Sequence, residues 1–379
     1  MEPMGNLART IVVSGYYGFN NSGDEAVLHA IVTALRDEAK AAGAPAPRIV
    51  VLSGDPAETA RLHGVEAAHR MRPLAVLGAL RRADALISGG GSLLQDVTSA
   101  KSALYYLAVL KLARWLRVPT FIYAQGVGPI RDRGRFGPMI RSAFEASRYI
   151  SVRDEESKAL VASFGVAPER IRVVPDPVMG MGLSLEAPVS GSGAAASPRI
   201  GVSVRFWRED RGELSRIAAA LAKVLENRAD AKVALLPFHL PSDKLASEFI
   251  ADRLREAGYG PDRVEQHGGA AHPSDMLREV ARCDLLVGMR LHSLIYAATA
   301  GVPPIAVSYD PKIDQFMRRL GEAPVGDTDG VEADALASAV LGRLEVGKNA
   351  WYGEKFAGIE EMQQNSRAPA QQIFRELRI

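Results

Sequence analysis

The fold class is decided by residues 10–41, which read TIVVSGYYGFNNSGDEAVLHAIVTALRDEAKA. Thr10–Ser14 is a short apolar run rich in β-branched residues, which predicts a buried strand. Gly15 and Gly18 permit a tight turn, and Asn21 can cap the helix that the pattern predicts over Asp24–Ala41. A strand, a glycine-rich turn and a helix in this order are typical of an α/β protein with a parallel sheet.

The same alternation continues to about residue 180 and predicts a first α/β domain over residues 1–180. Its further strands are expected at Ile49–Leu52, Ala85–Ile87, Thr120–Tyr123, Tyr149–Val152 and Ile171–Val174. Residues 181–198 are rich in Gly, Ala and Ser and predict a linker. The alternation then restarts and predicts a second α/β domain over residues 199–345. Residues 346–379 predict one or two helices that could cross back to the first domain.

The composition bounds the class of protein. The 379 residues are 47% hydrophobic and 24% charged, which is typical of a folded globular chain. A net charge of +2 leaves no general attraction for nucleic acid. The one cysteine, Cys283, fits a reducing compartment, and no signal peptide is visible, so we expect a cytoplasmic location.

Two Rossmann-like domains are expected to face each other across a cleft, with ligands bound outside the carboxyl ends of the strands. In the first domain, three glycine-rich turns follow predicted strands and suggest a binding rim rather than packing alone. The candidate substrate-binding residues there are Gly18, Asn21, Gly90, Gly91 and Gln125. Asp24 and Asp96 are candidate bases or hydroxyl ligands on the acceptor side.

Arginines also end predicted strands. Arg153 closes the run at Tyr149–Val152, and Arg205 closes the first run of the second domain. His239 ends the next run in the same manner. Because a guanidinium binds a carboxylate or phosphate through two parallel hydrogen bonds, both arginines are candidate substrate-binding residues. A structural ion pair with a neighbouring acid is the alternative for Arg153.

The sharpest motif follows Asp284–Gly288. Arg290, His292 and Ser293 begin the next predicted helix, and Lys312 follows the next strand. These residues could form a pocket for a small polyanion, with His292 able to transfer protons near neutral pH. A capping histidine with surface cations is the alternative. The seven histidines show no paired metal-ligand spacing, so no metal is predicted.

Two apolar segments carry cations at their ends, residues 70–82 and 101–117. Helices that cover the sheet are the simpler interpretation, but either segment could rest on an anionic membrane surface. No segment supplies the roughly 20 apolar residues of a membrane-spanning helix.

Taken together, the motifs resemble the polysaccharide pyruvyl transferase family, most closely its CsaB-type members. The matching stretches are residues 15–26 (GYYGFNNSGDEA), 88–96 (SGGGSLLQD), 124–129 (AQGVGP), 151–157 (SVRDEES), 175–177 (PDP) and 288–294 (GMRLHSL). The resemblance implies a fold like that of GT-B glycosyltransferases. It implies transfer of pyruvate from phosphoenolpyruvate, as co-substrate with no further cofactor, to a sugar, with release of phosphate.

In CsaB-type members the acceptor is an N-acetylmannosamine residue of a secondary cell wall polymer precursor on a lipid diphosphate. The product is a 4,6-ketal, and the pyruvylated polymer anchors surface-layer proteins. The resemblance assigns donor binding and catalysis to His292 and Lys312, and to Arg153. It also suggests contact with the inner face of the cytoplasmic membrane.

Two other functions remain open from the residues. A nucleotide-sugar glycosyltransferase would share the fold, although no acidic residue suited to ribose hydroxyls is evident near His292–Ala300. A non-catalytic glycan-binding module would not need the cations that gather at the predicted strand ends.

Overall fold

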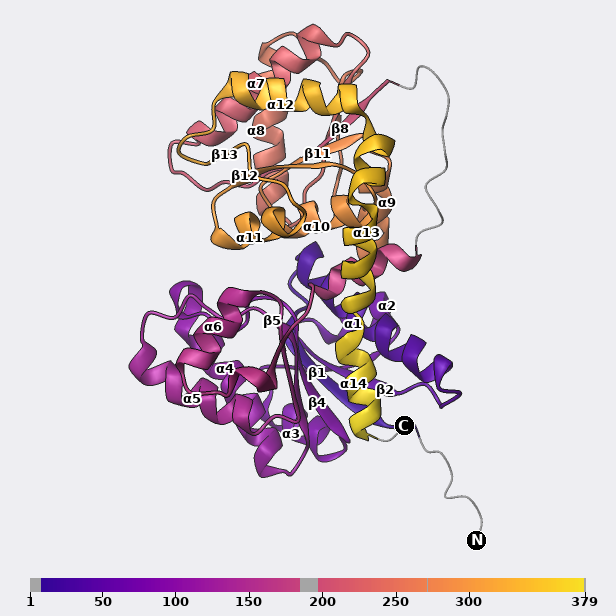
Figure 1. Ribbon diagram of the computed structural model, residues 1–379, viewed down its shortest axis with the longest axis vertical. Helices are drawn as coiled ribbons and strands as arrows, with labels where there is room; N and C mark the ends of the chain where they lie inside the picture. The colour runs from indigo at the N-terminus through magenta and orange to yellow at the C-terminus, as the bar shows by residue number, and fades with distance from the viewer. Residues whose placement is uncertain (1–7, 185–196, 271, 378–379) are drawn as a thin grey trace. The chain divides into compact units, whose positions relative to one another are not determined.

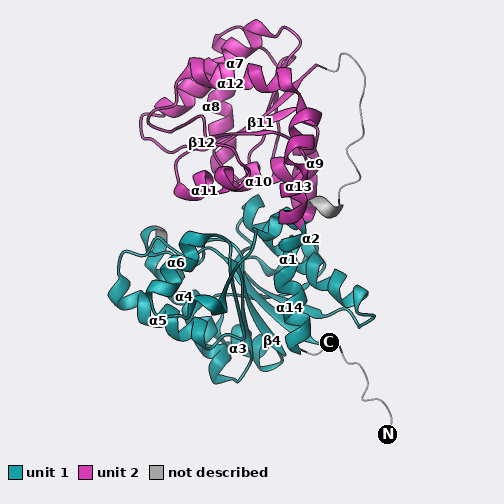
Figure 2. Cartoon of the chain, in the orientation of Figure 1, with its two compact units in different colours: residues 1–180, 364–379 teal, residues 181–363 magenta. Residues whose placement is uncertain are grey.

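The structure is a computed structural model that describes residues 8–184, 197–270 and 272–377. The chain divides into two compact units, residues 1–180 with 364–379 and residues 181–363 (Figure 2). Residues 185–196, which make up most of the predicted linker, lie outside the described residues.

The first unit contains a seven-stranded sheet in the order β3-β2-β1-β4-β5-β6-β7 (Figure 1). All of its described strand pairs are parallel. The strands are β1 (Thr10–Tyr17), β2 (Arg48–Ser53), β3 (Glu66–His69), β4 (Ala85–Gly89), β5 (Thr120–Gln125), β6 (Tyr149–Val152) and β7 (Ile171–Val173). The strand order reverses between β1 and β4, and such a switch point is where open α/β sheets bind their ligands.

Helices cover both faces of this sheet (Figure 1). They are α1 (Ser22–Ala41), α2 (Pro56–His63), α3 (Pro73–Arg81), α4 (Asp96–Trp115), α5 (Arg133–Glu145), α6 (Glu155–Ser163) and α14 (Ala368–Leu377), with 3₁₀ turns at Pro168–Arg170 and Pro177–Ser184. Helix α14 comes from the C-terminal end of the chain and packs against α1, β5 and β6. Arg367 and Asp37 form an ion pair at 3.0 Å that joins this segment to α1.

The second unit contains a six-stranded parallel sheet in the order β10-β9-β8-β11-β12-β13. Its strands are β8 (Arg199–Ser203), β9 (Lys232–Leu235), β10 (Val264–Gln266), β11 (Leu285–Gly288), β12 (Pro304–Ser308) and β13 (Gly326–Asp327). Its helices are α7 (Gly212–Asn227), α8 (Ser242–Glu256), α9 (Pro273–Ala281), α10 (Leu291–Thr299), α11 (Pro311–Arg319), α12 (Ala333–Val346) and α13 (Lys348–Asn365). The order reverses between β8 and β11.

The predicted α/β class with two Rossmann-like domains is confirmed, but the sequence pattern missed two edge strands. Strand β3 reads EAAH and has none of the β-branched or aromatic residues that mark a strand. Strand β13 is only two residues long. Edge strands bury less side-chain area than central ones, so their sequences carry a weaker hydrophobic signal.

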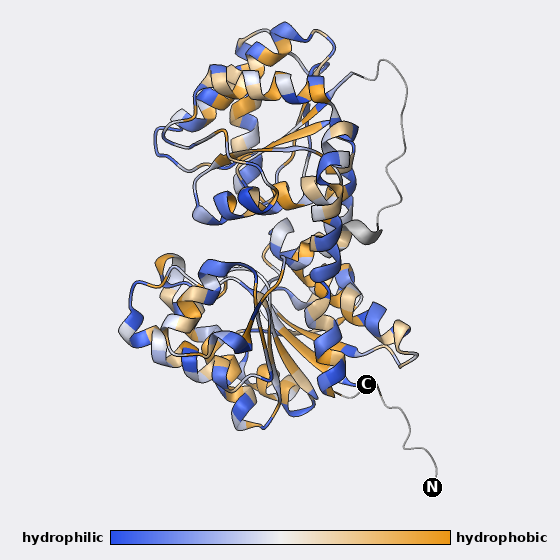
Figure 3. Ribbon diagram, viewed as in Figure 1, coloured by the Kyte–Doolittle hydropathy of each residue, from blue (hydrophilic) through white to orange (hydrophobic). Residues whose placement is uncertain are grey.

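The strands form the apolar centre of each unit, while the helices turn polar residues outward (Figure 3). Cys283 is 1% exposed, and burial raises the pKa of its thiol to about 11, so it is a small core residue as predicted. Within the described part of the chain, no helix combines the length and apolar character that a membrane crossing needs.

Candidate active site

The loop after β1 uses its polar groups internally. Asn21 caps α1 by accepting from the Gly23 amide at 3.1 Å, and it donates to Asp24 at 2.6 Å. The Gly18 amide donates to the Glu25 carboxylate at 2.7 Å. A side chain on Gly18, which has φ of +78°, would lie 2.3 Å from the Ser53 hydroxyl. Gly18 and Asn21, both predicted to bind substrate, therefore shape this turn, and the Gly18 amide is already occupied by Glu25.

The glycine loop after β4 is also shaped by packing. A Cβ on Gly90 would lie 1.9 Å from the Val27 side chain, and one on Gly91 would lie 3.0 Å from the Asp24 carboxylate. The Gly91 carbonyl accepts from the Gly126 amide at 2.9 Å, which locks this loop to the loop after β5. The structure thus brings Asp24 and Gly91 together at the switch point of the sheet.

Gln125 ends β5 and is fully buried. Its side-chain oxygen accepts from the Ser88 hydroxyl at 3.0 Å, while its Nε2 has no partner among the described residues. The preceding Ala124 has φ of +45°, a strained conformation for a residue with a side chain. The pairing of β5 with β6 is irregular at the same point. Gln125 is therefore held by a strained turn with one amide donor unused by the described chain.

Asp96 does not fit the predicted role of a base. Its two carboxylate oxygens accept from the backbone amides of Arg131 and Asp132 at 2.7 and 2.8 Å. Desolvation would raise the pKa of Asp96, but these hydrogen bonds outweigh it and lower the pKa below its ordinary value. A carboxylate with a lowered pKa and both oxygens occupied is a poor proton acceptor. Asp96 instead stabilises the loop before α5.

Arg153 lies at the carboxyl end of β6 and is 8% exposed. It donates to the Ser92 hydroxyl at 2.7 Å and lies 3.4 and 3.6 Å from carboxylate oxygens of Asp154 and Asp176. The alternative of a structural ion pair is therefore realised, and the charge of Arg153 is largely neutralised. Its contacts bring together the loops that follow β4, β6 and β7.

Arg70 is a residue of this rim that the sequence did not identify. It follows β3, is 6% exposed, and donates to the Gly15 carbonyl and the Tyr106 hydroxyl, both at 3.1 Å. Its guanidinium lies over the rings of Phe19, Tyr105 and Tyr106, 4.3–5.4 Å from their centroids. Burial raises the pKa of Tyr106 to about 12 against the opposing effect of Arg70, so the phenol stays neutral. No described carboxylate pairs with Arg70.

In the second unit, Arg290 is held by a residue that the sequence analysis did not single out. Asp243 of α8 is fully buried and accepts from two nitrogens of Arg290, with Nε at 3.0 Å. Desolvation would lower the pKa of Arg290, but the bonds and charge of Asp243 outweigh it and raise the pKa. Asp243 also accepts from the His239 amide at 2.9 Å. Arg290 is therefore a fixed but neutralised cation beside the loop after β9.

Arg205 differs, because aromatic rings hold it rather than a carboxylate. It follows β8, is partly buried, and donates to the Tyr309 hydroxyl at 3.0 Å. Its guanidinium lies 5.3 and 4.8 Å from the ring centroids of Trp207 and Tyr309. Within the described chain no carboxylate pairs with it. Arg205 thus retains a positive charge at the switch point between β8 and β11.

His239 stands in the field of these cations. Desolvation and the nearby Arg290 lower its pKa, Asp243 acts in the opposite direction, and Arg205 lowers it further. His239 is therefore a neutral imidazole near pH 7, which can accept a proton or a hydrogen bond. The sequence placed it at a strand end, but only the structure shows the cations around it.

The remaining predicted residues of the second unit have different surroundings. Ser293 is fully buried and donates to the Arg290 carbonyl at 2.7 Å, so it is a structural residue and not a substrate ligand. His292 is partly buried in the first turn of α10. Lys312 begins α11 and pairs with Asp310 at 2.9 Å. The topology places His292 at the end of β11, next to the strand end of Arg205, and Lys312 at the end of β12, one strand further from it.

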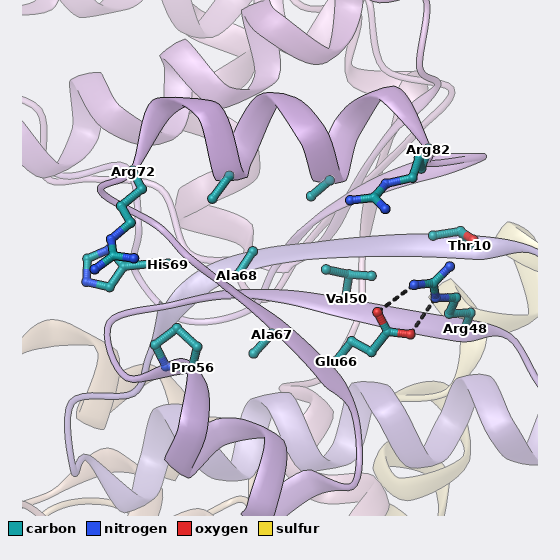
Figure 4. A pocket seen from close by; sticks show the side chains of 12 residues that line it. Thr10, Arg48, Val50, Pro56, Glu66, Ala67, Ala68, His69, Arg72 and Arg82 are labelled. Atoms are coloured by element: carbon teal, nitrogen blue, oxygen red, sulfur yellow. Dashed lines mark hydrogen bonds and ion pairs between the residues drawn. The ribbon is translucent and has the colours of Figure 1, made fainter.

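A cavity of about 400 Å³ at the edge of the first sheet contains none of the predicted site residues. It lies along β3 and α3, with His69 and Arg72 at one end and Thr10, Arg48 and Arg82 at the other (Figure 4). Arg48 is already engaged by Glu66, with one bond of 2.7 Å. The candidate catalytic and binding residues lie at the carboxyl ends of the strands and not in this edge cavity.

The comparison with protein families decides the class of protein. The family described as polysaccharide pyruvyl transferase matches residues 21–311. The chain belongs to this family. It is accordingly a pyruvyl transferase. Of the site residues predicted from the sequence, all except Gly18 and Lys312 lie within the matched region.

Solved structures similar to this pyruvyl transferase show the same fold at low identity. UDP-GlcNAc 2-epimerase from Neisseria meningitidis, bound to UDP-GlcNAc, has 12% identity and a TM-score of 0.61, covering 97% of this chain and 99% of the epimerase. A glycosyltransferase from Rickettsia africae has 12% identity and a TM-score of 0.63, with 98% of both chains covered. Anabaena Alr3699/HepE in complex with UDP has 17% identity and a TM-score of 0.60, covering 98% and 99%. These similarities confirm a GT-B-like fold for the pyruvyl transferase. No curated protein sequence matches it.

Proposed function

We propose that this pyruvyl transferase moves pyruvate from phosphoenolpyruvate to a ManNAc-type sugar of a lipid-diphosphate-linked cell wall polymer precursor. The product is a 4,6-ketal, and phosphate is released. The observation that carries the donor assignment is Arg205, a cation without a carboxylate partner in the described chain at the switch point of the second sheet. Phosphoenolpyruvate carries a carboxylate and a phosphate, and both need cationic or hydrogen-bonding partners.

The reaction balances with two acceptor hydroxyls. A proton adds to the methylene carbon of phosphoenolpyruvate, which leaves C2 electron-poor. One hydroxyl of the sugar bonds to C2 and loses its proton. The bond between C2 and the phosphate oxygen then breaks, and the second hydroxyl bonds to C2 and loses its proton. One of the two released protons replaces the proton used on the methylene carbon, and the other leaves with phosphate.

The surroundings of each candidate residue suggest its role in this reaction. Arg205 binds one anionic group of the donor, and Arg290, oriented by Asp243, donates to the same ligand. His292 contacts or protonates the departing phosphate, and Lys312 stabilises its charge. His239, kept neutral by its neighbours, is a further acid–base candidate. Asp24, beside Gly91, is the candidate for acceptor hydroxyls on the first unit.

The proposal extends to the setting of the reaction. A lipid-linked acceptor would bring the enzyme to the inner face of the cytoplasmic membrane, and the pyruvylated polymer would anchor surface-layer proteins. Phosphoenolpyruvate serves as the co-substrate, with no additional cofactor.

The test is phosphate release from phosphoenolpyruvate with and without a lipid-diphosphate-linked ManNAc–GlcNAc acceptor, followed by mass analysis of the glycan. We expect acceptor-dependent phosphate and a glycan that has gained one ketal-linked pyruvate. His292→Ala should abolish phosphate release, whereas His69→Ala, at the edge cavity, should retain it. Thermal stabilisation by a nucleotide sugar but not by phosphoenolpyruvate would reject this donor and favour the glycosyltransferase alternative.

A further inference from the structure

A basic surface on the first unit lies away from the carboxyl ends of the strands, where the candidate site residues are. It consists of Lys111, Arg114, Trp115 and Arg117, at the carboxyl end of α4 and just beyond it, and is called the α4 patch below. All four side chains are exposed, and Trp115 is 74% exposed. A tryptophan is costly to leave in water because it exposes a large apolar area, so this degree of exposure needs an explanation.

Among residues 8–184, 197–270 and 272–377, none neutralises the cations of the α4 patch. No carboxylate of the described residues pairs with Lys111, Arg114 or Arg117. The only recorded side-chain bond of these three within the described chain joins Arg114 to the Ser142 hydroxyl of α5 at 3.3 Å. The patch therefore presents an uncompensated positive charge around an exposed indole.

A cavity of about 290 Å³ opens beside these cations, between α4 and α5. Lys111, Arg114 and Ser142 are among its lining residues. Its apolar lining consists of Leu107, Leu110, Pro138, Met139, Ala143 and Ala146. Met139 is 37% exposed at this site. The cavity joins an apolar interior to a cationic rim, and this combination suits an amphiphile with an anionic head.

We propose that the α4 patch and this cavity bind the surface of a bilayer that contains anionic phospholipid. The lipid phosphates contact Lys111, Arg114 and Arg117, since basic residues near an anionic leaflet are attracted to it. The Trp115 ring lies at the level of the headgroups, where tryptophan is favoured. Part of an acyl chain enters the cavity between α4 and α5. This inference goes beyond pyruvyl transfer and does not depend on the identity of donor or acceptor.

The test is co-sedimentation of the full chain with phosphatidylcholine vesicles and with vesicles in which about one-third of the lipid is phosphatidylglycerol. Binding is expected only to the anionic vesicles, and it should weaken as salt rises from about 0.05 to 0.3 M. Lys111→Gln combined with Arg114→Gln should weaken binding about tenfold or more. Lipids brominated on the acyl chain should quench the fluorescence of the wild type, and Trp115→Phe should remove that quenching. Met139→Asp should weaken binding by placing a carboxylate at the cavity.

The matched control is Arg253→Gln with Arg255→Gln, which removes the same charge from α8 of the second unit. It should bind as the wild type does, and melting temperatures should show that all variants fold. Equal binding by the α4 patch variant and the control would overturn the proposal. So would an absence of binding by the wild type, or equal binding to neutral vesicles. Because no donor or acceptor is present, a failure of the proposed pyruvyl transfer would leave this result unaffected.

Discussion

Each unit places one arginine on aromatic rings near the switch point of its sheet, but the two arginines differ in exposure. Arg70 of the first unit is 6% exposed and is held by the Gly15 carbonyl and neutral phenols. Arg205 of the second unit is more accessible and contacts Trp207 and Tyr309. Aromatic faces hold a guanidinium in place without cancelling its charge. The more accessible Arg205 can therefore attract an anionic ligand, while the buried Arg70 stabilises the loop after β1.

Arg290 provides the contrasting case within the second unit. Its carboxylate partner, Asp243, fixes the guanidinium but also neutralises it. We therefore expect Arg205 to attract the anionic donor by its charge, and Arg290, fixed by Asp243, to contribute a positioned hydrogen bond to the same ligand. Four substitutions test these expectations.

The largest effect is expected from Asp243→Asn. The change leaves a buried guanidinium without its counter-charge, and breaking such a pair costs about 3–5 kcal/mol of unfolding free energy. Urea denaturation measures it. Asp230→Asn is the control, because Asp230 pairs with Arg228 at the surface and should cost less than about 1 kcal/mol. Similar losses in both variants would show that Asp243 does not secure Arg290.

Arg205→Met should weaken phosphoenolpyruvate binding by about 10- to 100-fold, the loss expected for a charge-assisted hydrogen bond. Unfolding free energy should change little, since no described carboxylate is left unpaired. Isothermal titration calorimetry measures the affinity, with Arg228→Met as the charge-matched control. Unchanged affinity in Arg205→Met would remove Arg205 from the donor site.

Arg70→Met should lower stability and leave donor binding unchanged, which is the opposite of the result expected for Arg205→Met. It leaves the Gly15 carbonyl without its donor, so we expect a loss of about 1–3 kcal/mol in unfolding free energy. Phosphoenolpyruvate affinity should remain that of the wild type. Denaturation and calorimetry on the same sample separate the two effects. A loss of donor affinity at full stability would place Arg70, not Arg205, at the anion.

The smallest effect concerns pH and His239. Its pKa in the folded state lies below the ordinary value of about 6.5, so below that pH the unfolded state binds more protons. The contribution of neutral His239 to the free energy of unfolding is therefore present above about pH 6.5 and is lost as the pH falls further. His239→Gln should flatten the decline in melting temperature between about pH 7.5 and 5.5. An unchanged acid slope would mean that the cations do not act on His239.

The amino-acid sequence alone was enough to predict the strand–helix alternation, the two α/β units and the strand-end positions of Arg205, Arg290 and His292. These features follow from short-range periodicity, because β-branched runs and glycine turns act on neighbouring residues. The same local signal located the glycine turn after β1. It missed β3, whose composition is atypical of a strand.

Which of these groups remain available to a ligand depends on long-range contacts that only folding creates. Asp243 meets Arg290 across 47 residues, and Arg70 meets the Gly15 carbonyl across 55. Asp96 receives the amides of a loop 35 residues away, and the Gly18 amide is taken by Glu25 on the following helix. The charge and proton affinity of a side chain depend on partners a few ångströms away, and folding alone brings such partners together. Residue type and strand-end position therefore predict a site, whereas long-range pairing decides which of its charges a ligand can use.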